Sequence, residues 1–181
     1  KGNYSWGDTY PLGFTPRLEG HGTDFSSVFG VKGENLGGFG VNYDFSSSYG
    51  SHYIHYYLRN TLNLSWGPNS PHNFVIGDLQ QEETNWNADF TYPMGDINLA
   101  FGLEWREETY TMYEGQKEAW MPGPWATVHL LVDPETGSNY TAPGLGANGM
   151  QGTSPAEAGV FKRDNTAFYA DVEYDMDALL V

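Results

Sequence analysis

The segment Ile97–Glu108, INLAFGLEWREE, alternates between apolar and polar side chains. Its odd positions as far as Trp105 are all apolar, and the positions between them carry small, amide or charged side chains. Successive side chains of a β-strand point to opposite faces, whereas the apolar face of a helix repeats every three or four residues. The segment therefore predicts a strand with one apolar and one polar face.

The segment before it, residues 83–92, alternates in the same way, and Pro93-Met94-Gly95-Asp96 between the two is typical of a turn. We expect an antiparallel hairpin here. Similar alternation elsewhere, together with 23 glycines and 29 aromatic residues, favours an all-β chain. The predicted strands cover residues 23–32, 39–49, 80–92, 97–110, 162–176 and 178–181.

The connections between these strands alternate between short and long. Long loops are predicted at residues 50–79 and 111–161, where glycine and proline are frequent. Transmembrane β-barrels have short periplasmic turns and long extracellular loops in this alternating order. The sequence thus predicts a single domain, 1–181, that is an antiparallel up-and-down meander and part of such a barrel.

Five full strands and part of a sixth are too few for a closed barrel, because single-chain barrels begin at about eight strands. We expect the remaining strands to come from a longer polypeptide or from other chains. In this hypothesis the polar side chains, such as Asn98, Glu104 and Arg106, face a wet lumen. The apolar side chains predicted to face lipid are Leu99, Phe101, Leu103, Phe168 and Val172.

Composition excludes some functions. Eight Lys and Arg against 23 Asp and Glu give a net charge of −15, which argues against binding nucleic acid. The chain has no cysteine, and its five histidines lack zinc-binding spacing. No pair of carboxylates stands out for glycoside hydrolysis. We therefore predict no catalytic residue, no metal ligand and no cofactor, so that the chain is not an enzyme.

The longest predicted loop contains four side chains that could stack on a sugar or on a chelate: Trp120, Trp125, His129 and Tyr140. These are the candidate ligand-binding residues. The alternative interpretation is that they fold the loop onto itself, as in compact surface loops. The sequence leaves both interpretations open.

Four segments carry a resemblance to a known family. Residues Ala100–Tyr110 resemble the barrel strand of TonB-dependent outer-membrane receptors that precedes a long extracellular loop. Residues 60–71 resemble a loop of the same receptors, residues 154–159 the end of the following loop, and Arg163–Glu173 the next strand. The resemblance covers nearly the whole chain in consistent order.

The resemblance implies a middle portion of a 22-stranded barrel in a bacterial outer membrane, without the plug domain and without the C-terminal strands. It implies uptake of a scarce ligand, most often a ferric siderophore and sometimes a vitamin or glycan. The partners implied are the TonB complex, acting through the plug, the chelate or glycan ligand, and outer-membrane lipid. The alternative hypothesis is a soluble secreted β-sandwich that binds carbohydrate, in which the apolar side chains are buried.

Overall fold

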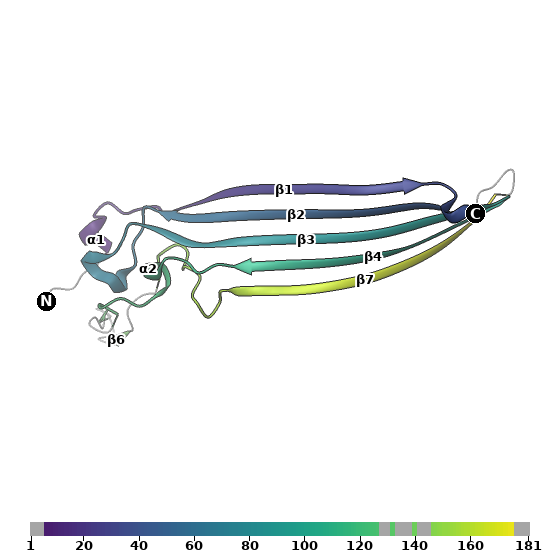
Figure 1. Cartoon of the computed structure of the whole chain (residues 1–181). Coiled ribbons are helices and arrows are strands. Elements are labelled where there is room, and N and C mark those ends of the chain that lie inside the picture. Colours follow the sequence, from purple (N-terminus) through teal and green to yellow (C-terminus); the bar gives the residue numbers. More distant parts are fainter. Residues whose placement is uncertain (1–5, 127–130, 133–138, 141–145, 176–181) are drawn as a thin grey trace. The chain divides into compact units, whose positions relative to one another are not determined.

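Five long antiparallel strands form one open sheet with the order β1-β2-β3-β4-β7 (Figure 1). The computed structural model describes residues 6–126, 131–132, 139–140 and 146–175. The strands are β1 (Arg17–Gly33), β2 (Asn42–Arg59), β3 (Asn73–Met94), β4 (Ile97–Met112) and β7 (Gly159–Tyr174). This confirms the all-β, up-and-down architecture expected from the alternating patterns.

The remaining elements are short. Helical turns occur at α1 (Trp6–Thr9), η1 (Leu36–Gly38), η2 (Leu64–Asn69) and α2 (Lys117–Trp120). Strands β5 (Leu131–Val132) and β6 (Asn139–Tyr140) pair with each other in a separate antiparallel ladder. Among the described residues, no helix has the length and apolar character needed to cross a membrane.

The strands are longer than the sequence predicts. The predicted loop at residues 50–79 is wrong, because β2 continues to Arg59 and β3 begins at Asn73, leaving only residues 60–72 between them. The first strand starts at Arg17 rather than at residue 23. In the β2 extension Ile54, Tyr56 and Leu58 keep the period of two, and in the β3 extension it is interrupted at Gly77. The glycine- and proline-rich residues 67–71 between the two extensions favour assigning the whole stretch to a loop.

The other limits shift less. Strand β4 ends at Met112 and β7 covers Gly159–Tyr174, so the second long connection comprises residues 113–158 instead of 111–161. The second predicted strand begins at Asn42 rather than at residue 39. The short strand predicted at residues 178–181 lies outside the described residues.

The two short connections are built from residues that tolerate a left-handed backbone. The β3–β4 turn places Gly95 at φ 63°. In the β1–β2 connection Asn35 has φ 54°, and its side-chain oxygen accepts a hydrogen bond from the backbone N–H of Gly40 at 2.8 Å. Glycine and asparagine adopt this conformation at low cost, which fixes both turns locally.

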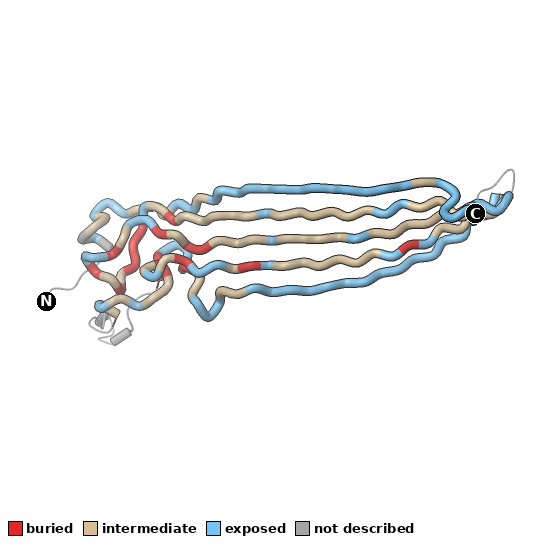
Figure 2. The backbone as a smooth tube through the Cα atoms, in the orientation of Figure 1, coloured by how far each residue is buried: buried red, intermediate tan, exposed pale blue. Residues whose placement is uncertain are grey.

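The chain divides into two compact units. Unit 1 comprises residues 1–23, 53–80 and 111–160, and unit 2 comprises residues 24–52, 81–110 and 161–181. Unit 1 has a small hydrophobic core made of Leu58, Phe74, Ile76, Ala119 and Ala147, with Tyr56 packed against it. In the described part of unit 2 only Gly102 is buried (Figure 2). The two units therefore differ in side-chain burial: unit 1 has a buried core, and the described part of unit 2 has none.

A glycine in β3 makes the core of unit 1 possible. Phe74 and Ile76 pack with Leu58 of β2, whereas Asp78 of the same strand contacts Tyr53 of β2. The alternation of β3 is therefore shifted between Ile76 and Asp78, where Gly77 has φ 133°. A Cβ at Gly77 would lie 2.7 Å from the carbonyl oxygen of Tyr113, so only glycine fits this position.

Candidate functional site

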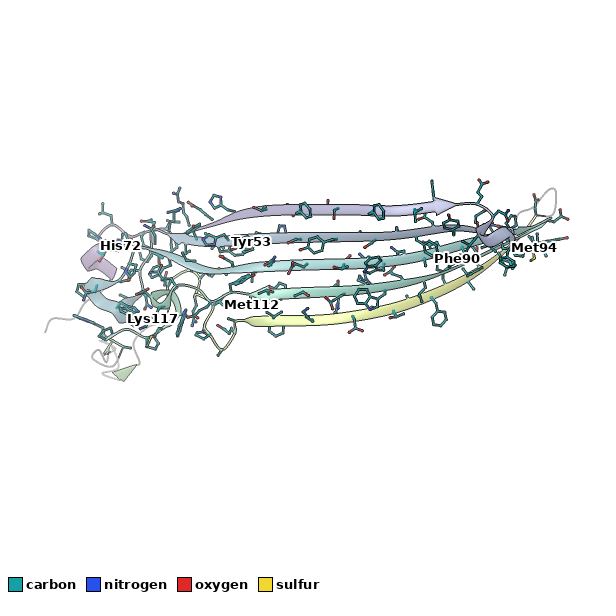
Figure 3. The ribbon with its side chains drawn as sticks, viewed as in Figure 1. Tyr53, His72, Phe90, Met94, Met112 and Lys117 are labelled. Atoms are coloured by element: carbon teal, nitrogen blue, oxygen red, sulfur yellow. The ribbon has the colours of Figure 1, made fainter. Side chains whose placement is uncertain are left out.

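The first candidate surface is the apolar face of unit 2. Ring contacts connect neighbouring strands across it: Phe45 lies edge-on to Phe90 with centroids 5.6 Å apart, and Phe90 stacks on Phe101 at 5.1 Å. A shallow groove continues this surface, lined by Phe29, Val31, Phe45, Trp86, Leu103 and Trp105 around the smaller Ser47 and Ala88. Aromatic and aliphatic side chains of β1, β2, β3 and β4 therefore lie on this face, among them Phe90, which Figure 3 labels.

The side chains predicted to face lipid lie in the strands of unit 2. Phe168 is 86% exposed, Val172 63% and Leu103 50%, while Phe101 is 41% exposed and Leu99 is half-buried. Isolated apolar side chains on a surface are ordinary, but monomeric soluble proteins rarely expose large contiguous apolar patches. Contact of these residues with lipid remains a prediction.

The opposite face of unit 2 is polar and internally hydrogen-bonded. Tyr169 of β7 crosses over Gly102 of β4 and donates its hydroxyl hydrogen to Asp89 of β3, 2.9 Å away. A Cβ at Gly102 would lie 2.4 Å from the Tyr169 ring, so glycine is required beneath it. The sheet therefore separates an apolar face from a polar one, as its alternating sequence predicts.

Strands β4 and β7 are further connected by polar pairs. The side-chain amide of Asn98 donates to Glu173 at 3.0 Å, and Arg163 donates to Glu108. Lys162 lies 3.6 Å from Glu107. Acidic side chains of β4 are thus partly neutralised by cations from β7.

Unit 1 contains a polar cluster that the sequence patterns did not indicate. The hydroxyl of Tyr53 donates to one carboxylate oxygen of Asp78, and Nδ1 of His55 lies against the other. The hydrogen bond to Asp78, with partial burial, raises the pKa of Tyr53 to about 12. Tyr53, His55 and Tyr57 alternate in the sequence and lie in β2, whereas the sequence analysis assigns them to a loop.

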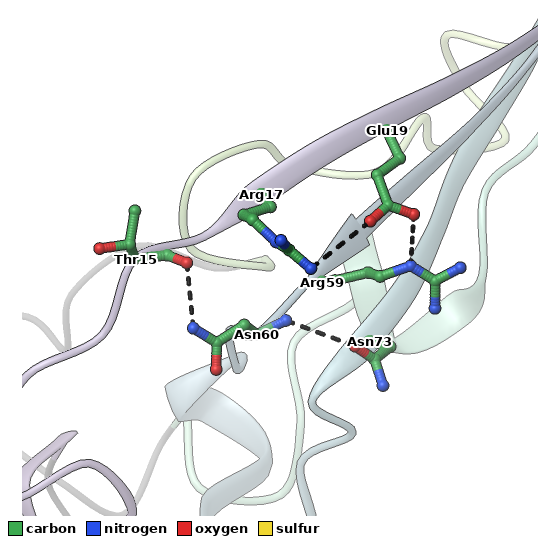
Figure 4. Close-up of polar contacts among 6 residues, drawn as sticks. All are labelled: Thr15, Arg17, Glu19, Arg59, Asn60 and Asn73. Atoms are coloured by element: carbon green, nitrogen blue, oxygen red, sulfur yellow. Dashed lines mark hydrogen bonds and ion pairs between the residues drawn. The ribbon is translucent and has the colours of Figure 1, made fainter.

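A second set of polar contacts holds the ends of strands β1, β2 and β3 in unit 1 (Figure 4). Arg59 donates from Nε to Glu19 at 2.5 Å, and this hydrogen bond lowers the pKa of Glu19. Asn60, which has φ 55°, donates from its side chain to the carbonyl of Thr15 at 3.0 Å. Its backbone N–H donates to the side chain of Asn73 at 3.3 Å. These bonds tie the start of β1 to the loop at residues 60–72.

Buried Asn63 organises the loops of unit 1. Its side-chain nitrogen donates to the carbonyl of Glu118 at 2.8 Å, and its side-chain oxygen accepts from both N–H and Oγ of Ser65. Its own N–H donates to Oγ of Ser70 at 2.8 Å. One fully buried amide thus joins the connection at residues 60–72 to the connection at residues 113–158.

Two of the four candidate ligand-binding residues are described with their side chains. Trp120 is half-buried and donates from Nε1 to the carbonyl of Gly115 at 3.2 Å. A Cβ at Gly67 would lie 2.6 Å from the Trp125 ring. The backbone N–H of Trp125 donates to the carbonyl of Ser65 at 2.8 Å. The Trp120 contact lies within one connection, whereas the Trp125 contacts join the connection at residues 113–158 to the one at residues 60–72. His129 and the side chain of Tyr140 lie outside the described residues, so a ligand role for the four remains a prediction.

Two further searches, one for metal-binding clusters and one for similar known proteins, give no additional site. In the parts of the chain that the structure describes, no three His, Asp or Glu side chains are grouped as they would be around a metal ion. Comparison with known proteins finds that no family model, no curated protein and no solved structure matches this chain.

Proposed function

We propose that the strand segments within residues 24–52, 81–110 and 161–174 form part of the wall of a transmembrane β-barrel in a bacterial outer membrane. The observation that supports this most directly is the absence of burial in the described part of unit 2, where only Gly102 is buried although one face is apolar. Exposing apolar surface to water costs roughly 25 cal/mol of free energy per Å². In a barrel wall the apolar face of such a sheet contacts lipid and the polar face contacts water, so neither face is exposed to an unfavourable solvent.

The dimensions of the apolar band support the same proposal. The apolar positions of β4 run from Ile97 to Trp105. At roughly 3.3 Å per residue and a tilt of about 40°, this length spans about 20 Å, close to the apolar band of roughly 25 Å in such barrels. Unit 1, with its own core and polar clusters, lies outside the proposed membrane-spanning segments.

We further propose that the barrel is an active transporter that takes up a scarce ligand, a ferric siderophore in the first instance, using the TonB complex. The support is the resemblance of four ordered segments to TonB-dependent receptors. In this proposal the connections at residues 60–72 and 113–158 contribute to the entrance through which the ligand passes. Their hydrogen bonds through Asn63 make this entrance preorganised, which reduces the entropic cost of binding a ligand.

A pair of single-cysteine variants tests the membrane proposal, because the natural chain has no cysteine. Leu103→Cys and Glu104→Cys are each labelled with a thiol-reactive, environment-sensitive fluorophore. The two labels then lie at adjacent positions on opposite faces of β4. With the full chain in vesicles that contain brominated lipid, we expect strong quenching at position 103 and weak quenching at position 104. A chain that stays soluble and monomeric without detergent, with position 103 covered, would support the β-sandwich alternative and contradict this proposal.

The ligand proposal has a separate test. The chain is titrated with a panel of ferric hydroxamates, ferric catecholates and oligosaccharides, with binding followed by calorimetry. If Trp120 and Trp125 contact the ligand, Trp120→Phe and Trp125→Phe should weaken binding of the same compound at least several-fold. Trp86→Phe, on the apolar face of unit 2, is the matched control and should leave binding unchanged. Equal affinities for all three variants would contradict a ligand role for the two tryptophans.

A further inference from the structure

Two histidines of neighbouring strands lie opposite each other in unit 1. The antiparallel register of β1 and β2 is fixed by three facing pairs: Gly20 with Tyr56, Asp24 with His52, and Gly30 with Ser46. In this register His21 is directly opposite His55, between the first two pairs. Directly opposite residues on one face of a sheet have Cβ atoms roughly 5 Å apart. The two imidazoles are therefore neighbours on one face of the sheet.

A carboxylate of the third strand extends this pair into a row. Asp78 of β3 lies against Nδ1 of His55, and its other oxygen accepts a hydrogen bond from the hydroxyl of Tyr53. Both imidazoles also pack edge-on against the Tyr57 ring, His55 with centroids 4.2 Å apart and His21 with centroids 6.0 Å apart. His21, His55 and Asp78 thus form a row across β1, β2 and β3, although they are too far apart in sequence for a spacing motif to indicate it.

Two buried atoms of this row have no hydrogen-bond partner among the described residues, Nε2 of His55 and Oδ1 of Asp78. Buried polar atoms are almost always paired, so an unpaired one points to a bound water or ion. The other Asp78 oxygen is occupied by Tyr53, whose pKa of about 12 keeps its hydroxyl protonated as a donor. A carboxylate held in this way by an outer hydrogen bond is typical of metal ligands. Oδ1 of Asp78 and the imidazole beside it therefore have the arrangement of a metal site.

We propose that His21, His55 and Asp78 bind a divalent transition-metal ion, Zn²⁺ in the first instance, across strands β1, β2 and β3. Two imidazoles and one carboxylate are ligands that suit Zn²⁺, with water completing the tetrahedron, whereas Mg²⁺ and Ca²⁺ take mainly oxygen ligands. The inference goes beyond the proposed barrel function and does not rest on it.

Binding needs one side chain to move. In the part of the chain that the structure describes, no three His, Asp or Glu side chains surround one point, and the His21 ring rests against a tyrosine ring instead. His21 is exposed, and exposed side chains change rotamer within nanoseconds, so its imidazole can turn toward His55. The side chains of His55 and Asp78 are 25% and 16% exposed, so an ion can reach them. The nearby carboxylate of Glu19 is not available, because it already accepts a hydrogen bond from an arginine of β2.

Zinc titration of the full chain tests the inference, in lipid vesicles or, if the chain proves soluble, in buffer. After metal has been removed with a chelator, Zn²⁺ is added and its binding is followed by calorimetry, with Mg²⁺ and Ca²⁺ titrated in the same way. His21→Ala is the decisive variant, because its side chain is exposed and its loss leaves the strands intact. His52→Ala is the matched control, an exposed histidine of β2 that faces Asp24 instead. Hydrogen exchange of unit 1 amides verifies that each variant is folded.

We expect one Zn²⁺ to bind per chain. His21→Ala and His55→Ala should each weaken its binding at least about tenfold, and His52→Ala should leave it unchanged. Tyr53→Phe should weaken binding about tenfold, as the loss of an outer hydrogen bond to a ligand does.

The absence of saturable Zn²⁺ binding by the folded chain would overturn the inference. Equal affinity of His21→Ala and the natural chain would overturn it too, as would equal losses in His21→Ala and His52→Ala. Binding of Mg²⁺ as tight as that of Zn²⁺ would also overturn it, because it would indicate a general attraction of cations to an acidic chain. Failure of the quenching test described above would remove the membrane proposal and leave this inference standing.

Discussion

Unit 1 buries side chains and unit 2 does not, although the same five strands supply residues to both. In unit 1, Phe74 and Leu58 are almost fully buried against small residues of the long connections. In unit 2, aromatic side chains of comparable size, such as Phe29 and Phe168, remain largely exposed. Unit 1 therefore buries apolar side chains in a core of its own, whereas the apolar side chains of unit 2 need contacts from outside the described chain to be covered.

The largest expected effect is at the core of unit 1. Phe74→Ala removes a side chain that is 1% exposed, and large-to-small changes of this kind cost about 3 to 5 kcal/mol of unfolding free energy. Urea-dependent hydrogen exchange of unit 1 amides measures the loss. Leu12→Ala, in the same unit but at a side chain that is fully exposed, is the control and should change stability by less than about 0.5 kcal/mol. A similar loss in both variants would mean that the core does not stabilise unit 1.

The second prediction tests the surroundings of unit 2. Leu103→Arg places a charge on the apolar face and should destabilise the chain in vesicles by about 2 to 4 kcal/mol, the cost of arginine near the bilayer midplane. Asn98→Arg lies on the polar face of the same strand, where its amide contacts Glu173, and should be much milder. Urea titration of both variants in vesicles gives the comparison. Equal losses would contradict the assignment of one face to lipid and the other to water.

These two regions also differ in how well the sequence predicts them. In unit 2 the strict alternation around Phe101 and Leu103 gives strands, faces and antiparallel order directly, because local pattern and structure agree. In unit 1 the extension of β2 is assigned to a loop although Ile54 and Leu58 keep the period of two, because glycine and proline are frequent just beyond it, in residues 67–71. The sequence also does not predict the shift at Gly77, because a single glycine indicates a β-bulge only when its cross-strand contacts are known.

The candidate site shows the same limit. Residue type alone indicates Trp120 and Trp125 as candidates. Their partners are glycines, Gly115 through its carbonyl and Gly67 through its lack of a side chain, and a glycine in the sequence does not indicate either contact. Nothing in the sequence distinguishes Asn63 from the other polar residues of its loop. Its role depends on contacts such as that with Glu118, which no spacing rule connects to it. Long-range hydrogen bonding in irregular loops is therefore the part that the sequence does not predict.

The third prediction concerns this buried amide. Asn63→Ala leaves the buried N–H of Ser65 and the partly buried carbonyl of Glu118 without their partner, and an unsatisfied buried group costs about 1 to 3 kcal/mol. We expect a loss of roughly 2 kcal/mol that is confined to unit 1 amides in hydrogen exchange. Asn69→Ala, an exposed position in η2, serves as the control and should be close to neutral. A loss spread equally over both units would argue that Asn63 does not act locally.

The smallest expected effect is the pH dependence of the Tyr53–Asp78 contact in unit 1. The pKa of Tyr53 is raised to about 12 because its neutral hydroxyl donates to the Asp78 carboxylate. In the unfolded chain the tyrosine loses its proton near its ordinary pKa of 10, at lower pH than in the folded chain. The stabilisation is therefore complete below pH 10 and is lost as the pH rises through about 12. The stability difference between the natural chain and Tyr53→Phe should shrink over this range. Asp78→Asn should lower the pH midpoint at which Tyr53 forms tyrosinate, measured as the ultraviolet absorbance difference between each chain and its Tyr53→Phe counterpart. An unchanged midpoint would show that the Asp78 carboxylate does not raise the pKa of Tyr53.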